Sequence, residues 1–136
     1  MMYEVTSKRV GQDAKGNDRE YVEKFLIDNC ELCAEAESKC LEFWNGENDV
    51  ISVKQSKVRE FVNERIDDDQ DIYLATIEDV FVNETTGEEK TTKYIVGLFA
   101  VSTEGAMSIV TNYMRQGLND LTLTSIRKTK IVELLK

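Results

Sequence analysis

Apolar and polar residues alternate over Tyr3–Val10, and this period of two predicts a β-strand. Turn-forming residues follow at 13–17, and a returning strand is predicted over Tyr21–Asp28. Apolar residues then recur every three or four positions between Leu32 and Trp44, which is the spacing of an amphipathic helix. A third strand is predicted over Val50–Gln55. The first half of the chain therefore reads strand, strand, helix, strand.

The second half shows the same order of patterns. Its returning strand, Thr91–Ala100, is nearly all apolar, which predicts that it is buried on both faces or central in a sheet. Ser102 or Thr103 is suited to cap the helix that follows, because a hydroxyl accepts from the free N–H groups of a first turn. A last strand is predicted over Leu121–Lys128. The expected buried stripe of this helix is Ala106, Ile109, Val110, Tyr113 and Met114.

Two closing segments, 50–61 and 123–134, resemble each other directly. Three of the twelve aligned pairs are identical, and most of the others are conservative. Because several such matches occur in the same order, we interpret the chain as a tandem duplication. The predicted boundaries are residues 3–62 for the first repeat, 63–72 for a linker and 73–135 for the second repeat.

These patterns predict an α+β fold in which residues 1–136 form a single domain of two pseudo-symmetric repeats. Each repeat contributes three strands and one helix, giving a mostly antiparallel six-stranded arrangement with two helices. The segments Val58–Val62 and Ile131–Leu135 are expected as short amphipathic tails. Whether the strands form one sheet or two is left open by the pattern.

The repeated phrases resemble those of one protein family. They are a Tyr-x-Val-Thr opening, a glycine-containing hairpin, an alanine-rich helix and a Ser-Val/Ile-x-x-Ser/Thr-x-Val/Ile-x-Glu ending. Together they resemble an uncharacterised family, a domain of unknown function, from Bacteroidetes and their phages. The resemblance implies the duplicated strand–strand–helix–strand fold and a phage or mobile-element origin. It implies no activity and no functional residues.

Charge and length exclude several classes of protein. The chain has 136 residues, with 17 basic and 26 acidic side chains, and its net charge of −9 disfavours non-specific wrapping of nucleic acid. It contains no histidine, the commonest general base and metal ligand. Its longest apolar runs are too short to span a membrane, and the start lacks the features of a secretion signal.

Three cysteines lie close together, at Cys30, Cys33 and Cys40. An odd number in so short a stretch is a poor disulfide framework and indicates a reducing cytoplasm. We expect reduced, buried, structural thiols; a metal site and a redox pair are the alternatives. The acidic run Asp67–Asp71 lacks the glycine of a calcium loop and is interpreted as a solvated linker. No metal ion and no cofactor is expected.

Basic residues gather in each closing segment. If the two segments lie together, they would form a patch for phosphate, nucleotide or a nucleic-acid backbone. Charge decoration of exposed strand ends is the alternative, since lysine there discourages edge-to-edge pairing. The six candidate residues are Lys54, Lys57, Arg59, Arg127, Lys128 and Lys130.

No pairing of a nucleophile with a base and no glycine-rich phosphate loop is present in the sequence. We therefore expect a non-catalytic, cytoplasmic binding protein whose acidic surface contacts a basic face of a host or phage protein. A homodimer is compatible with this interpretation. A module for small ligands or nucleic acid, using the basic clusters, is the alternative, and a minor virion component is a further one.

Overall fold

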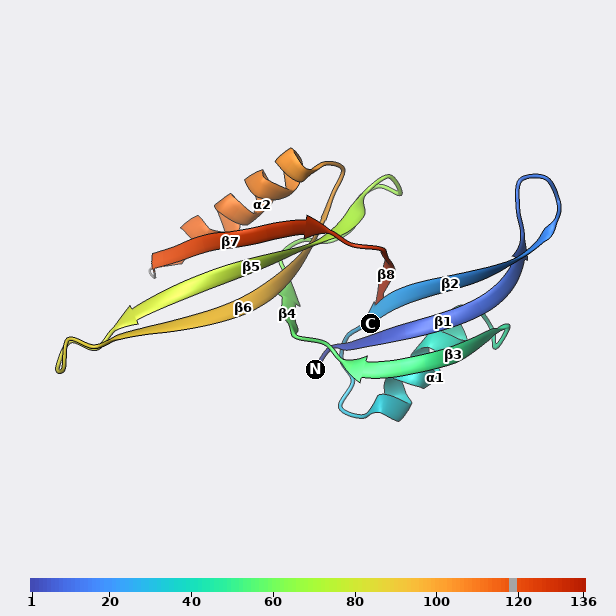
Figure 1. The fold of residues 1–136 in the computed structure, drawn as a ribbon, viewed down its shortest axis with the longest axis horizontal. Helices are drawn as coiled ribbons and strands as arrows, with labels where there is room; N and C mark the ends of the chain where they lie inside the picture. The colour runs from blue at the N-terminus through green and yellow to red at the C-terminus, as the bar shows by residue number, and fades with distance from the viewer. Residues whose placement is uncertain (118–119) are drawn as a thin grey trace. The chain divides into compact units, whose positions relative to one another are not determined.

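The computed structural model describes residues 1–117 and 120–136, which form eight strands and two helices (Figure 1). In chain order these are β1 (Tyr3–Gln12), β2 (Asp18–Ile27), α1 (Cys33–Phe43), β3 (Asn48–Gln55), β4 (Val58–Phe61), β5 (Asp71–Val82), β6 (Glu89–Ala100), α2 (Thr103–Arg115), β7 (Asp120–Lys128) and β8 (Ile131–Leu135). Neither helix is long and apolar enough to cross a membrane within this described part of the chain.

The chain divides into two compact units, each with one sheet and one helix. Unit 1 comprises residues 1–56 and 130–136, and its sheet has the order β3-β1-β2-β8. Unit 2 comprises residues 57–129, and its sheet has the order β4-β6-β5-β7. In unit 1, β1 pairs antiparallel with β2 and β3, and in unit 2, β5 pairs antiparallel with β6 and β7. The remaining strands pair parallel: β8 with β2, and β4 with β6.

The expectation of a six-stranded arrangement is wrong, because both predicted tails form strands. Val58 pairs with Ile95 on β6, and Leu134 pairs with Leu26 on β2. The first tail lies along the edge of β6, and the second lies along the edge of β2. At these edges the backbone N–H and C=O groups of each tail find hydrogen-bond partners. The fold is thus α+β with two sheets of four strands.

The fourth strand of each sheet comes from the other half of the chain. Two residues, Ser56 and Lys57, lead from β3 in unit 1 to β4 in unit 2. Thr129 and Lys130 lead from β7 back to β8 in the same way. The boundaries of the compact units therefore differ from those of the sequence repeats.

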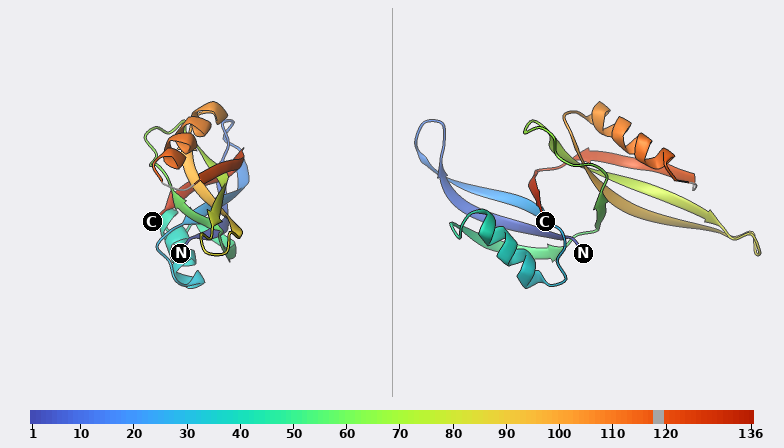
Figure 2. Two further views of the ribbon diagram at one scale, coloured as in Figure 1. Left: turned by 90° about the vertical axis from the view of Figure 1, so that its left-hand side faces the viewer. Right: turned by 180° about the vertical axis from the view of Figure 1, so that it is seen from behind.

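Each helix packs on one face of its own sheet, and the hydrophobic core of each unit lies between that helix and that sheet (Figure 2). On α2, Ala106 and Val110 are fully buried, and the rest of the predicted stripe packs against the core. The Ser102 side chain accepts a hydrogen bond from the Gly105 N–H at 3.1 Å, which confirms the predicted cap. On α1, Ala36 and Cys40 are buried, but Leu32 at the N-cap and Phe43 at the end of the helix are exposed.

Among the described residues, β5 pairs with β7 from Tyr73–Lys128 to Val80–Asp120, and β5 pairs with β6 from Asp71–Ala100 to Val82–Glu89. The predicted central position of β6 is confirmed, because it lies between β4 and β5. Its buried residues are Val96, Leu98, Phe99 and Ala100, with Gly97 among them.

Candidate functional site

The six candidate basic residues are divided between the units. Lys54 and Lys130 belong to unit 1, and the other four belong to unit 2. Within unit 2, Arg59 lies on β4 and Arg127 on β7, which are the opposite edges of the sheet. Two strands separate these edges, so the structure of unit 2 does not gather its four cations into one patch.

Three of these cations contact groups of their own unit. The Lys54 Nζ lies 3.7 Å from a carboxylate oxygen of Glu4, and the Lys128 Nζ lies 3.2 Å from one of Asp71. The Arg59 guanidinium lies over the Tyr94 ring, 4.8 Å from its centroid. Contacts of this kind reduce the positive charge that a polyanion would meet.

Arg59 is also part of the wall of a cavity in unit 2. The cavity has a volume of about 350 Å³ and lies at the C-terminal end of α2. Tyr113 in the last turn of the helix, Tyr94 on β6 and Asp79 on β5 line it, together with Glu60 beside Arg59. Strand alternation places Asp79 and Tyr94 on the same sheet face as the core residues of β5 and β6. The cavity is therefore a polar continuation of the core beyond the end of the helix.

A short hydrogen bond organises this cavity. The Tyr113 hydroxyl donates to a carboxylate oxygen of Glu60 at 2.6 Å. Burial raises the pKa of Tyr113, and Glu60 and Tyr94 raise it further. The phenol therefore stays protonated and remains a donor to Glu60 at neutral pH.

A second cavity, of about 400 Å³, lies in unit 1. It lies beside the loop between α1 and β3, and Arg9 and Asn48 contribute to its wall. Arg9 pairs with Asn48 across β1 and β3, as Asp79 pairs with Leu121 across β5 and β7. In both sheets this pairing follows the same irregularity, between residues 6 and 7 or residues 76 and 77.

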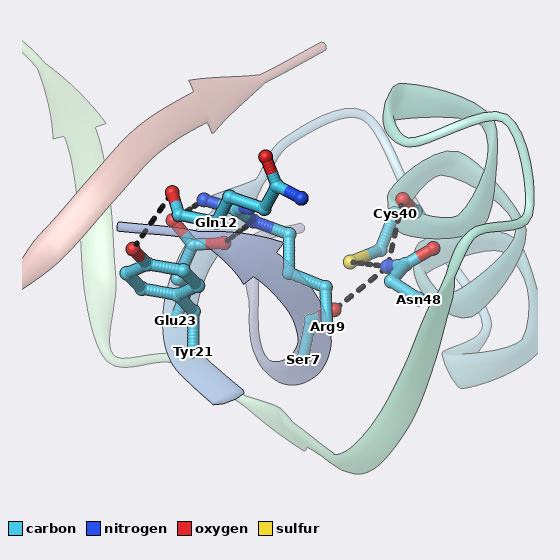
Figure 3. Close-up of polar contacts among 7 residues, drawn as sticks. All are labelled: Ser7, Arg9, Gln12, Tyr21, Glu23, Cys40 and Asn48. Atoms are coloured by element: carbon cyan, nitrogen blue, oxygen red, sulfur yellow. Dashed lines mark hydrogen bonds and ion pairs between the residues drawn. The ribbon is translucent and has the colours of Figure 1, made fainter. Parts of the chain in front are cut away.

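The Arg9 guanidinium contacts aromatic and acidic side chains of unit 1 (Figure 3). Its Nε donates to Glu23 at 2.6 Å, and its guanidinium lies 4.6 Å from the centroid of the Tyr21 ring (Figure 3). The centroid of the Trp44 ring lies 4.2 Å from the same guanidinium. Two aromatic faces and a carboxylate are the groups that hold a guanidinium most favourably. The Arg9 guanidinium is therefore held by groups of its own unit, and this stabilises unit 1.

Beside it, Asn48 is buried and links β3 to β1 and α1 (Figure 3). Its Nδ2 donates to the Ser7 Oγ at 2.7 Å, to the Cys40 carbonyl at 3.4 Å and to the Cys40 Sγ at 3.7 Å. Burial raises the pKa of the Cys40 thiol, although these polar neighbours oppose the shift. Cys40 is therefore a protonated core residue at neutral pH.

The prediction that the cysteines are buried is correct for Cys30 and Cys40 and wrong for Cys33. All three thiols are free, and Cys30 and Cys40 are buried, but Cys33 is exposed. Cys33 is the first residue of α1 and lies on the same side of the helix as Ala36 and Cys40, so its exposure reflects its place at the end of the helix. Within the described part of the chain, no cluster of three or more acidic or cysteine side chains is arranged to hold a metal ion.

The acidic run lies in a hydrogen-bonded loop between β4 and β5. The Gln70 Oε1 accepts from the N–H groups of Ile66 at 2.8 Å and Asp67 at 3.3 Å, and Arg65 donates to the Gln70 carbonyl at 2.9 Å. Asp67, Asp68 and Asp69 are all exposed. The loop thus holds three carboxylates in solvent within unit 2.

Comparison with known proteins gives a family. The family model described as Domain of unknown function (DUF4494) matches residues 1–136, the whole chain. The chain belongs to this family. No curated protein sequence matches it.

For this DUF4494 chain, the sequence pattern had singled out Arg59 as a candidate basic residue and Tyr113 as part of a buried helical stripe. It did not link Tyr113 to Glu60 or Asp79, because the cavity residues come from four different elements. One signal was available: Glu60 is one of the identical positions of the two closing segments and matches Glu133. A charged residue that both closing segments share, such as Glu60, is therefore a position to test by substitution.

Proposed function

We propose that this chain is a non-catalytic binding protein whose partner is another protein with a basic face. The observation that supports this proposal is the distribution of charge. The candidate cations are spread over different strands and several contact carboxylates or rings, whereas Asp67–Asp69 project from an ordered loop. With a net charge of −9, such a surface attracts basic partners and repels polyanions.

The remaining parts of the proposal concern origin and setting. We propose that the two halves descend from a duplicated strand–strand–helix–strand unit within a single domain. We also propose a phage or mobile-element origin and a cytoplasmic location, in keeping with the sequence resemblance and the three free thiols. A homodimer and a role as a minor virion component are compatible with the same acidic surface.

The experiment is affinity capture from a nuclease-treated lysate of the source cells, followed by binding measurements with the purified partner. Neutralising Asp67, Asp68 and Asp69 to asparagine should weaken binding several-fold, and the loss should be largest at low salt. Neutralising three bases to glutamine, namely Lys54, Lys57 and Lys130, is the matched control and should not weaken it.

The opposite pattern would contradict the proposal. If the partner is a nucleic acid, its binding is lost when the bases are neutralised, and its affinity falls steeply with rising salt. If the captured protein is acidic, or binds the aspartate-to-asparagine variant as tightly as the unmodified chain, the acidic surface is not its docking face.

A further inference from the structure

We propose that the free edge of β3 pairs antiparallel with β3 of a second copy of this chain, which gives a dimer with two-fold symmetry. β3 has eight residues and lies at the end of its sheet, with β1 on one side and, among the described residues, no strand on the other (Figure 1). An unpaired edge of this kind is a template for a further strand. The dimer does not depend on the basic partner proposed above, and its interface lies within unit 1.

Half of the β3 residues direct their backbone groups toward the free edge. The Ser56 N–H donates to the Met2 carbonyl at 2.9 Å, so Ser56 faces β1, and this direction alternates along an antiparallel ladder. Beyond the irregularity in the strand, Lys8 has the same parity as Met2 and pairs with Asp49, so Asp49 also faces β1. The residues whose N–H and C=O groups face outward are then Asn48, Val50, Val53 and Gln55.

A two-fold axis between Ile51 and Ser52 brings these outward-facing groups opposite one another. Val50 and Val53 both pack against the core although they are three positions apart, because the side-chain direction reverses at the irregularity between them. The same reversal occurs in both copies, so residues opposed across the axis also lie on the same face of the sheet. The opposed backbone pairs are Val50 with Val53 and Asn48 with Gln55, each formed twice.

Opposite charges meet in the same register, on the face of the sheet away from α1. Asp49 of each copy lies opposite Lys54 of the other, and the symmetry forms this contact twice. Both side chains are exposed, and Lys54, with 69% of its side chain exposed, has Glu4 at 3.7 Å. Directly opposed charges of opposite sign stabilise a strand pair, and like charges destabilise it. Ile51, which is 55% exposed, lies beside the axis and loses contact with water in the dimer.

β7 offers a comparison within the same protein. It is the corresponding edge strand of unit 2, and its pairing with β5 has the corresponding irregularity. Thr122 stands there where β3 has Asp49, and Arg127 stands where β3 has Lys54. The same two-fold pairing of β7 would therefore set Arg127 opposite an uncharged threonine. Self-complementary charge is a property of the β3 edge and not of the β7 edge.

Charge reversal tests the register of the dimer. Asp49→Lys sets two lysines against each other across the axis, and Lys54→Asp sets two aspartates. Each variant alone should raise the dimer Kd about tenfold or more in sedimentation-velocity experiments on the full chain. An equal mixture of the two should form a heterodimer, because each reversed side chain then meets an opposite charge. Since one reversal changes the net charge of −9 by two, both variants stay acidic, and overall attraction does not explain their pairing.

Two changes on β7 are matched controls. Arg127→Asp makes the same charge change as Lys54→Asp at the corresponding position and should leave the dimer Kd unchanged. Val53→Pro removes an outward-facing N–H from an edge strand, a place where proline is tolerated, and should abolish the dimer while the circular-dichroism spectrum is kept. Ile126→Pro is its counterpart, because the Thr129 N–H donates to the Ile72 carbonyl at 3.0 Å and alternation turns Ile126 outward. That variant should still dimerise.

Three results would overturn the inference. The first is an unmodified chain that sediments as a monomer at every concentration. The second is a dimer that Arg127→Asp weakens as much as Lys54→Asp does. The third is a mixture of the Asp49→Lys and Lys54→Asp variants that sediments no differently from the separate variants. The mixing experiment decides the question even if Val53→Pro does not fold.

Discussion

Gly97 on β6 pairs with Phe61 on β4 and lies against its ring, and Gly97→Ala is therefore a direct test of how that strand is held. A Cβ at this position would lie 2.6 Å from two atoms of the Phe61 ring. Ordinary carbon contacts are about 3.5–4.0 Å, so the ring would have to move by about 1 Å. It has little freedom to do so, because it also packs on Phe99 with ring centroids 5.2 Å apart.

The expected cost follows from this geometry. Overpacking of this size destabilises a protein by about 1–3 kcal/mol. In a Phe61→Ala background the obstruction is absent, and Gly97→Ala should be neutral or stabilise by up to about 1 kcal/mol through the unfolded chain. The two substitutions should therefore be coupled by about 2 kcal/mol.

Equilibrium unfolding in urea, followed by far-ultraviolet circular dichroism, measures all four proteins of this cycle. Gly105→Ala on α2 is the matched control, because the nearest atom to its added Cβ is the Ser102 Oγ at 3.4 Å. That change should stabilise the helix by up to about 1 kcal/mol. If Gly97→Ala costs the same with and without the Phe61 ring, close packing of β4 against β6 is not what holds that strand.

Three further predictions address other parts of the molecule. Removing residues 130–136 should lower amide-exchange protection over residues 24–27 of β2, which pair with β8, while β5 and β6 keep theirs; equal loss in both units would contradict the assignment of β8 to unit 1. Because burial raises the pKa of Cys40, the unfolded thiol releases its proton first above about pH 8.5. The free energy of unfolding should then fall as pH rises, by at most about 1.4 kcal/mol per pH unit. Urea unfolding at pH 8 and 9.5 should show a smaller decrease for Cys40→Val, and an unchanged decrease would exclude the thiol as its source. Reversing four bases to glutamate should leave the fold intact and nucleic-acid binding weak before and after, as measured by gel shift over a range of salt; tight binding that the change abolishes would favour the nucleic-acid alternative. The four bases are Lys54, Lys57, Arg127 and Lys130.

Local pattern predicted the parts of the fold that local chemistry decides. The cap at Ser102 and the buried stripe containing Ala106 and Val110 follow from residue type and helical spacing. The central place of β6 follows from its apolar run. Each of these features depends on residues of one helix or strand, and those residues are close together in the sequence.

The parts that were missed depend on contacts between distant residues. Nothing in the five residues from Val58 to Val62 shows that they add a parallel strand to β6, because that partner lies more than thirty residues away. Arg9 has the same inward parity as Tyr3 and Val5 in the alternating pattern, so its burial beside the core could be read from the sequence. Its two rings and its carboxylate could not, because Tyr21, Glu23 and Trp44 lie on other elements.

The exchange of β4 and β8 has a consequence for how the protein is made. A ribosome delivers residue 129, and with it every strand of unit 2, before it delivers β8. Unit 1 contains the first strand to be synthesised, yet its sheet gains its fourth strand last. Domains ordinarily complete themselves in the order of synthesis, from the N-terminus onward. In this protein that order is reversed. The sheet of unit 1 is completed only when the C-terminal segment has been synthesised, and the edge of β2 that pairs with β8 stays unpaired until then.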